Sequence, residues 1–242
     1  MAGSLPKVVI GMPIASGTLP WPTAVSLLGT VRVLDQEGIK FKIEAPTGCS
    51  VVQWARSAVA EAFLKTDFSH LFWVDADIMW TPDDFIRLLG FGAVLDVVGA
   101  TYPFKKDPPG FLINTEGAAG KLEVNGLGCV KVKSMGLGFT LVKRHVVEMV
   151  AADKPLVYDP LNQVERRDIF RVDHTPHKHK VGGRTLPGPR GEDVAFFDDV
   201  REAGFDCWLD PSVKLGHIGQ KIYRGDPIEE LGLSEFAKEE RT

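Results

Sequence analysis

The sequence has little cysteine, no long apolar run and no excess of positive charge. Three cysteines occur in 242 residues, far apart and without Cys-x-x-Cys or Cys/His spacing, so neither a disulfide framework nor a zinc-ribbon site is expected. No apolar stretch approaches the roughly 18 residues of a membrane span, and the run at 8–10 is too short for the core of a signal peptide. These absences predict a cytoplasmic protein in a reducing compartment.

The charge balance excludes a global positive field. Lys and Arg number 28 against 32 Asp and Glu, a formal net charge of −4, which does not draw a protein to nucleic acid or anionic lipid. With 44% hydrophobic and 25% charged residues, the chain has the composition of an ordinary globular protein. Any polyanionic partner must therefore be bound by a local basic segment.

Helix and strand patterns alternate through about the first hundred residues. A helical period runs over 21–36, an alternating strand over 39–43 and a second helix over about 51–64. The continuously apolar stretch 71–74 is typical of a parallel strand covered on both faces. Thr81 and Pro82 begin a third helix, and 97–100 is another strand. This order predicts an α/β fold with a Rossmann-like sheet and helices on both faces.

The second half has a different pattern. Short alternating stretches at 129–132 and 139–142 predict a smaller antiparallel extension that makes the sheet mixed. Residues 152–190 show no period and are interpreted as a long loop, followed by a helix over 194–203 and a strand over 205–209. We expect a single domain over 1–225 and a polar C-terminal tail over 226–242.

Asp75 and Asp77 follow the apolar strand at its carboxyl end, the edge of an open α/β sheet where ligands bind. Carboxylates at this spacing can hold Mg²⁺ or Mn²⁺, whose remaining coordination sites go to substrate phosphates and water. An Asp-x-Asp pair can also simply begin a turn. Because apolar residues flank the pair on both sides, and buried charges are costly without a ligand, we favour the metal site.

Two further elements carry candidate chemistry. Glu192 and Asp193 precede a predicted helix, where acids stabilise the helix N-terminus; Asp193 first, and Glu192 second, could instead act as a general base. His217, between two glycines, is either a turn residue or an Mn²⁺ ligand. Lys221 and Arg224 could neutralise a departing diphosphate or form a solvated basic turn.

The order of these motifs resembles the GT-A glycosyltransferases, particularly compact phage and bacterial members similar to family 2. The resemblance covers about 7–224 and includes Arg56, the Asp-x-Asp pair, Gly136-Leu137-Gly138-Phe139, Gly191-Glu192-Asp193 and His217. It implies a nucleotide-sugar donor such as a UDP-sugar, held with Mn²⁺ or Mg²⁺. It further implies metal ligation by Asp75, Asp77 and His217, and donor contacts from Arg56, Ala76 and the 13–16 loop with Pro13, Ala15 and Ser16.

The acceptor prediction rests on residues 166–190, where seven basic residues stand against two acids. Such a segment is either solvated loop or a lid that binds a polyanion. With the phage-like resemblance, it motivates a hydroxymethylated base in DNA as acceptor in the host cytoplasm, contacted by Lys178, Arg184 and Arg190. A polysaccharide, lipid or protein acceptor shares every upstream motif.

Two other classes of function remain open. A nucleotidyltransferase also presents acid-held Mg²⁺ to a nucleotide, but it usually carries a basic Gly-rich loop after the first strand. The segment 11–17 contains no lysine. A non-catalytic carbohydrate- or nucleic-acid-binding module would bind its ligand without Mn²⁺ and would tolerate Asp75→Ala.

Overall fold

The computed structural model describes residues 5–115, 122–159, 163–181 and 184–233, with the backbone course alone between 173 and 187. Its centre is a mixed sheet of eight strands in the order β2-β1-β3-β8-β5-β13-β7-β6. The strands are β1 (Lys7–Gly11), β2 (Lys40–Glu44), β3 (His70–Val74), β5 (Val97–Gly99), β6 (Ile113–Thr115), β7 (Val130–Met135), β8 (Phe139–Lys143) and β13 (Cys207–Leu209).

The strand directions confirm a mixed sheet. β1 is parallel to β2 and β3, and β13 is parallel to β5. β8 is antiparallel to both β3 and β5 and lies between them. β7 and β6 form the antiparallel edge expected from the sequence. The strand at β8, expected in a peripheral extension, is therefore a central one, as its buried side chains require.

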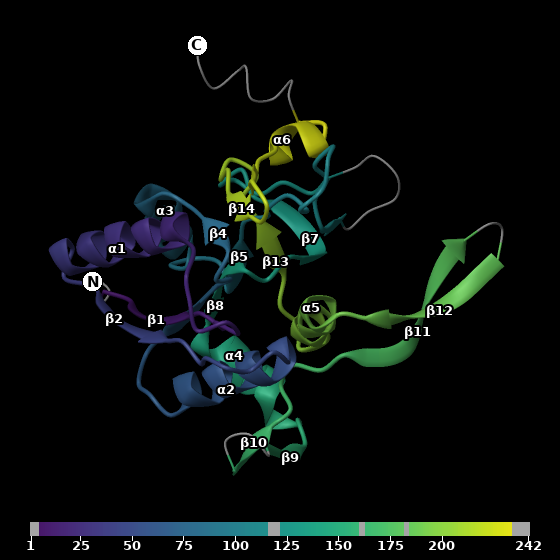
Figure 1. Cartoon of the computed structure of the whole chain (residues 1–242), viewed down its shortest axis with the longest axis horizontal. Helices are drawn as coiled ribbons and strands as arrows, with labels where there is room; N and C mark the ends of the chain where they lie inside the picture. The colour runs from purple at the N-terminus through teal and green to yellow at the C-terminus, as the bar shows by residue number, and fades with distance from the viewer. Residues whose placement is uncertain (1–4, 116–121, 160–162, 182–183, 234–242) are drawn as a thin grey trace.

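Helices cover both faces of the sheet (Figure 1). α1 (Trp21–Gln36) and α3 (Pro82–Phe91) lie on one face, and α2 (Val52–Leu64), α4 (Arg144–Ala152) and α5 (Glu192–Glu202) lie on the other. Strand β3 contributes side chains to two hydrophobic cores, one on each face of the sheet. Leu71 and Trp73 pack on one face, and Phe72 and Val74 pack on the other. This burial on both faces explains the continuous apolar run.

Helix α1 has an unusual inner face that is polar. The Thr23 hydroxyl donates to the carbonyl of Ile78 at 2.8 Å, and the Ser26 hydroxyl donates to the carbonyl of Trp80 at 2.6 Å. The Trp80 indole N–H donates to the Thr30 hydroxyl at 2.8 Å. These groups are buried, so their hydrogen bonds fix α1 to the segment that follows the Asp-x-Asp pair.

A small sheet forms beside the large one. Its order is β15 (Ile222–Tyr223), β14 (Gly216–Ile218) and β4 (Ile78–Met79). β14 pairs antiparallel with β4, with His217 opposite Ile78. The pairing brings two segments far apart in the sequence together, so that the late histidine lies next to the Asp-x-Asp pair. The short helix α6 (Pro227–Glu230) follows.

The prediction of a long loop without regular structure over residues 152–190 was wrong. These residues contain two antiparallel hairpins: β9 (Leu156–Asp159) with β10 (Val164–Arg167), and β11 (Asp173–Val181) with β12 (Arg184–Arg190). Figure 1 shows β11 and β12 extending away from the body of the molecule. Pro176 and Pro187 obscure the alternation in sequence, yet two-stranded ribbons tolerate proline because each strand has a free edge.

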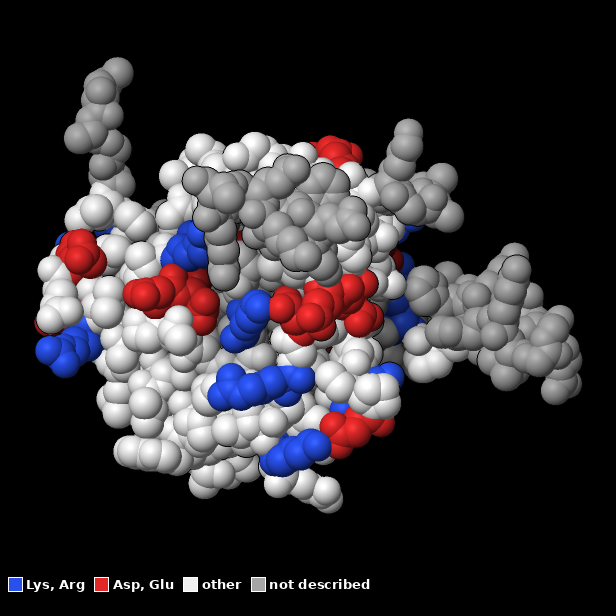
Figure 2. All heavy atoms as spheres, turned by 90° about the horizontal axis from the view of Figure 1, so that it is seen from above, with Lys and Arg blue, Asp and Glu red and all other residues white. Residues whose placement is uncertain are grey.

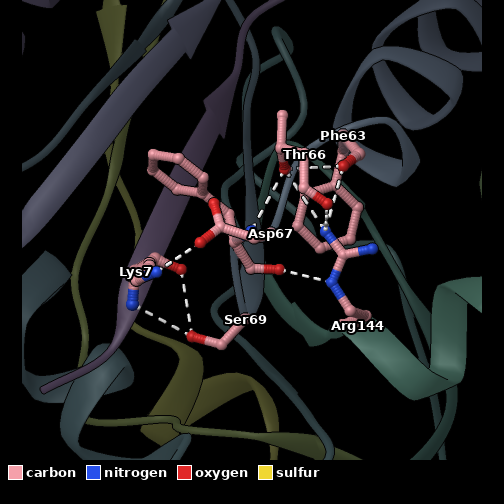
Figure 3. Close-up of polar contacts among 7 residues, drawn as sticks. Lys7, Phe63, Thr66, Asp67, Ser69 and Arg144 are labelled. Atoms are coloured by element: carbon pink, nitrogen blue, oxygen red, sulfur yellow. Dashed lines mark hydrogen bonds and ion pairs between the residues drawn. The ribbon is translucent and has the colours of Figure 1, made fainter. Parts of the chain in front are cut away.

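At the amino-terminal end of β3, polar contacts around the turn at 66–69 hold this edge of the sheet (Figure 3). Arg144, at the start of α4, donates to the carbonyls of Phe63 at 3.1 Å and Thr66 at 2.9 Å. Its cation thus satisfies the carbonyl end of α2, whose dipole is negative there. Asp67 pairs with Lys7 on the same edge.

Among the residues that the structure describes, no helix is long and apolar enough to cross a bilayer.

Candidate active site

A cavity of about 550 Å³ opens at the carboxyl edge of β1 and β3. The loop after β1 forms one wall, the start of α2 forms another, and the Asp-x-Asp stretch forms the floor. The cavity therefore brings together seven predicted donor-site residues, although they come from three separate segments. They are Pro13, Ala15, Ser16, Arg56, Asp75, Ala76 and Asp77.

Asp75 is held by two side chains within the protein. Its Oδ1 accepts from Arg56 Nη2 at 3.0 Å, and its Oδ2 accepts from the Tyr102 hydroxyl at 2.9 Å. Gly138 lies so close that a Cβ there would sit 2.2 Å from Asp75 Oδ2. A Cβ on Gly136 would sit 2.9 Å from the Tyr102 hydroxyl. The two glycines of the Gly-Leu-Gly-Phe motif therefore make room for Tyr102 and Asp75.

Arg56 links the cavity to a second group of acids. Its side chain is buried over the Trp73 ring, 5.8 Å from the ring centroid. Nη2 lies 3.5 Å from Asp193 Oδ1, and Nε lies 3.7 Å from Glu192 Oε1. Burial opposes the charge, but the carboxylates of Asp75, Asp193 and Glu192 outweigh it and raise the pKa of the guanidinium. Arg56 is thus a permanent cation shared by three acids.

Asp193 lies in the first turn of α5, next to Glu192, and its side chain does more than stabilise the helix N-terminus. The structure gives α5 no side-chain cap hydrogen bond. Asp193 Oδ2 instead accepts from the backbone N–H of Leu137 at 3.2 Å. Burial, with the nearby charges of Glu192 and Asp75, outweighs Arg56 and raises the pKa of Asp193 to about 7. A carboxyl group with such a pKa is suited to exchange protons near neutral pH.

Asp77 has the opposite electrostatic environment. Its Oδ2 lies 3.5 Å from His217 Nε2 and accepts a hydrogen bond from the Lys105 ammonium group. Burial alone would raise its pKa, but the contacts with His217 and Lys105 lower the pKa of Asp77 to about 2. Asp77 is therefore ionised at any physiological pH. His217 is oriented by its Nδ1, which contacts the carbonyl of Pro103 at 2.8 Å, and by the ring of Tyr102.

Asp77 and His217 have the chemistry that a divalent cation needs. A carbonyl oxygen only accepts, so Nδ1 of His217 carries a proton; Nε2 faces Asp77 and could ligate a cation only in its deprotonated form. In the described part of the chain, no group of three or more His, Cys, Asp and Glu side chains is arranged to hold a metal ion. Two of the three predicted ligands thus lie side by side, and metal ligation by all three stays a prediction.

The other predicted donor residues lie outside the cavity. Lys221 is exposed and forms a 2.6 Å ion pair with Asp107. The Arg224 guanidinium approaches the sulfur of Met79 at 3.8 Å. Neither residue lines the cavity. Their proposed contact with a diphosphate stays a prediction, and Lys221 would first have to leave its carboxylate.

The basic segment 166–190 is largely neutralised within the fold. Arg166 pairs with Asp159 at 2.7 Å, and Arg171 pairs with Asp199 at 2.8 Å. Arg167 and Arg190 also meet carboxylates, those of Glu61 and Asp198. The side chains of Lys178 and Arg184 lie outside the described residues. On the face seen in Figure 2, groups of acidic and basic side chains lie next to one another.

Two site residues were missed in the sequence, Tyr102 and Lys105. Both follow β5, whose carboxyl end lies at the same edge of the sheet as that of β3. A signal for them existed, because 97–100 was predicted as a strand and residues after a strand at this edge commonly bind ligands. The antiparallel position of β8 between β3 and β5, which carries Gly138 next to Asp75, had no such signal.

Comparisons with known proteins give distant structural similarity. No protein-family model and no curated protein sequence matches the chain. A crystal structure of GalNAc-T7 with UDP, GalNAc and Mn²⁺ aligns at 11% identity and a TM-score of 0.49 over 89% of this chain and 44% of that one. A glycosyltransferase involved in glycosylation of the major capsid of PBCV-1 aligns at 11% identity and a TM-score of 0.34, covering 59% and 63%.

A third solved structure is described as a glucose-1-phosphate thymidylyltransferase from Bacillus anthracis, in complex with sucrose. It aligns at 11% identity and a TM-score of 0.39 over 63% of this chain and 76% of that one. The chain spans less than half of the first structure's length and less than two thirds of the second's. At this level of similarity, none of the three assigns an activity to this chain.

Proposed function

We propose that the protein is a glycosyltransferase that moves a sugar from a nucleotide-diphosphate donor to a hydroxyl acceptor with the help of Mn²⁺ or Mg²⁺. One observation carries the proposal: the Asp75–Asp77 stretch forms the floor of a 550 Å³ cavity and meets an oriented histidine at Asp77. A cavity of this size suits a cofactor-sized or nucleotide-sized ligand. An ionised carboxylate beside an imidazole nitrogen suits a divalent cation, provided that this nitrogen is deprotonated when the cation binds.

Each group has a role in the proposed reaction. Asp77 and His217, with Asp75 as the third predicted ligand, would hold the cation, which when bound would stabilise the negative charge of the leaving diphosphate. The 13–16 loop, with Arg56 and Asp75, would position the nucleotide. Asp193, with its pKa raised to about 7, would accept the proton of the acceptor hydroxyl. Such a base implies inversion at the anomeric carbon.

Ligand-induced stabilisation of the full chain tests the donor and the cation together. Ligands that bind the native state raise the melting temperature. We expect one nucleotide sugar, UDP-linked or other, to raise the melting temperature with Mn²⁺ and much less without it. Asp77→Asn should abolish the metal-dependent part. Asp67→Asn, an exposed carboxylate at the opposite edge of the sheet, is the matched control and should retain it.

The products of the reaction separate the candidate activities. Transfer of the sugar with release of a nucleoside diphosphate supports the proposal. Release of pyrophosphate from a nucleoside triphosphate and a sugar phosphate would identify a nucleotidyltransferase instead. Stabilisation by no nucleotide sugar, with or without metal, would contradict both the donor and the cation.

For the acceptor, we propose a hydroxymethylated base in DNA, contacted by the β11–β12 hairpin. Four of the seven basic residues in 166–190 have carboxylate partners, and we propose that the other three, Lys178, Lys180 and Arg184, contact phosphates. We therefore expect log K for DNA to fall with log salt with a slope of about −3, because each phosphate contact contributes about −0.9. Transfer to a lipid, polysaccharide or protein, with none to hydroxymethylated DNA, would exclude this acceptor.

A further inference from the structure

Lys105 occupies the position at Asp77 where a cation would bind. Its Nζ donates to Asp77 Oδ2, the same oxygen that faces Nε2 of His217. The ammonium group and the imidazole thus converge on one carboxylate oxygen. A lysine ammonium is a compact positive charge and can satisfy a carboxylate in the absence of a metal ion.

The surrounding chain holds the lysine in this place. A Cβ on Gly219 would lie 3.1 Å from Cδ of Lys105, so the turn between β14 and β15 packs directly on the lysine stem. Lys221 pairs with Asp107, two residues beyond Lys105, and ties the same turn to the same loop. Lys105 retains a partly exposed side chain, so it can leave Asp77 toward solvent without disturbing the core.

We propose that Lys105 is an internal counter-ion that competes with the divalent cation for Asp77, so that metal binds only when the lysine side chain moves away. The inference rests on the proposed function for the identity of the site and goes beyond it by assigning Lys105. Two positive charges cannot share one carboxylate oxygen without strong repulsion, because unit charges at about 4 Å interact appreciably even in water. Lys105 therefore reduces the affinity of the free protein for metal.

A matched pair of neighbouring lysines tests this competition. Lys105→Met removes the ammonium group and retains much of the apolar stem. Lys106→Met removes the same charge from the adjacent residue, whose Nζ lies over the ring of Phe104 and not at Asp77. Lys105→Arg keeps a positive charge at the site. Mn²⁺ affinity of each full-length protein is measured by isothermal titration calorimetry, and by electron paramagnetic resonance of the free ion, without any sugar donor.

We expect Lys105→Met to bind Mn²⁺ about tenfold more tightly than the wild type, since a competing unit charge is removed from direct contact with the ligand oxygen. Lys106→Met and Lys105→Arg should stay within about twofold, because solvent screens the distant charge and arginine preserves the near one. Circular dichroism and melting temperature confirm that each variant is folded. Equal or weaker Mn²⁺ binding by folded Lys105→Met overturns the proposal.

The two proposals fail in different ways. If Asp77→Asn abolishes Mn²⁺ binding while Lys105→Met does not tighten it, the cation site stands and the competition is refuted. If Lys105→Met tightens binding but no nucleotide sugar is used, the competition stands and the glycosyltransferase activity is refuted. If neither the wild type nor Lys105→Met binds Mn²⁺, the competition is refuted together with the metal site.

Discussion

Two aspartates near the same cavity experience opposite electrostatic environments. The pKa of Asp77 is lowered to about 2, because His217 and Lys105 outweigh the effect of burial. The pKa of Asp193 is raised to about 7, because burial and neighbouring acids outweigh Arg56. Pairs of acids whose environments separate their pKa values commonly divide the roles of charge stabiliser and proton carrier. Here Asp77 is suited to the cation and Asp193 to the proton.

Asp193→Asn should lower kcat by at least about a hundredfold, because general acid–base groups typically contribute 10²–10⁴-fold. A base must be deprotonated to act, so wild-type kcat should rise with pH through about 7. The residual activity of the variant should lose this rise. Donor titrations by calorimetry check that the nucleotide still binds. An unchanged pH profile in the variant would assign Asp193 a structural role only.

Gly138→Ala should damage both the site and the fold, since its Cβ would lie 2.2 Å from Asp75 Oδ2. Overpacking of this kind typically costs about 1–3 kcal/mol, and the displaced carboxylate should weaken donor binding. Urea unfolding and donor titration measure the two effects. Gly126→Ala is the control, because a Cβ there meets no atom within 4 Å. Equal stability of the two variants would contradict the close packing of Gly138 on Asp75.

At the scale of elements, α1 attaches to its neighbour through hydroxyl groups. Its inner face carries Thr23, Ser26 and Thr30, while Trp21 and Leu28 on the outer face are 74% and 64% exposed. At these positions α1 departs from the usual amphipathic helix, although Leu34 in its last turn is buried in the core. The hydrogen bonds compensate for the polar groups that burial removes from water. They also fix α1, which follows the loop of the cavity wall, to the segment around β4 that directly follows Asp77.

Ser26→Ala should destabilise the protein by about 1–3 kcal/mol, the cost of leaving buried polar groups without partners. Ser26 Oγ donates to the Trp80 carbonyl at 2.6 Å and accepts from the Trp80 N–H at 3.1 Å, so both backbone groups lose a bond. Val25→Ala, one residue away and 48% exposed, should change stability by less than about 0.5 kcal/mol. Urea denaturation of both variants distinguishes the two faces of α1.

The elements that the sequence predicts well are those whose local signals agree with their environment. The apolar run of β3 and the start of α3 at Thr81 and Pro82 both appear at their expected places. β8 was recognised as a strand but not as a central one, because alternation carries no information about pairing partners. Helix α4 was missed between β8 and the hairpins. Prolines within β11 and β12 concealed that hairpin, where pairing between strands overrides local propensity.

The candidate site was predictable to the extent that strand ends could be located. The proximity of Asp75, Asp77 and Arg56 could be predicted, because the strand before the two aspartates and the helix that carries Arg56 were both located from the sequence. The position of His217 next to Asp77 depends on pairing between β14 and β4, which no spacing in the sequence encodes. The partners of the basic residues at 166–190 were likewise invisible, since Glu61 and Asp199 lie far away along the chain.

At the scale of the whole molecule, Asp193 should make stability depend on pH in an unusual direction. A carboxyl group normally titrates at 3.8, and in the folded protein Asp193 titrates at about 7. Between these values the folded state binds more protons than the unfolded state, so this group's contribution to the free energy of unfolding falls as pH rises from about 4 to about 7. Above pH 7 the loss is complete.

Urea denaturation from pH 4 to pH 8 measures the effect through a comparison of the wild type with Asp193→Asn. The difference in stability should shift in favour of the variant as pH rises through this window, and by several kcal/mol at most, since one pKa unit corresponds to about 1.4 kcal/mol. Groups far from Asp193 titrate equally in both proteins and cancel. A difference that stays constant with pH would show that the pKa of Asp193 is the same in both states.

The Asp75–Asp77 stretch spans the gap between two separate sheets. The Asp75 N–H donates to the carbonyl of Gly138, the residue before β8 of the large sheet, whereas the Asp77 carbonyl accepts from the N–H of Ile218 in the small one. Asp75 is thus attached to the large sheet and Asp77 to the small one, and only Ala76 separates them in the chain. A tilt of the small sheet would move Asp77 while Asp75 stayed in place, so the distance between the two carboxylates would change with the angle between the sheets.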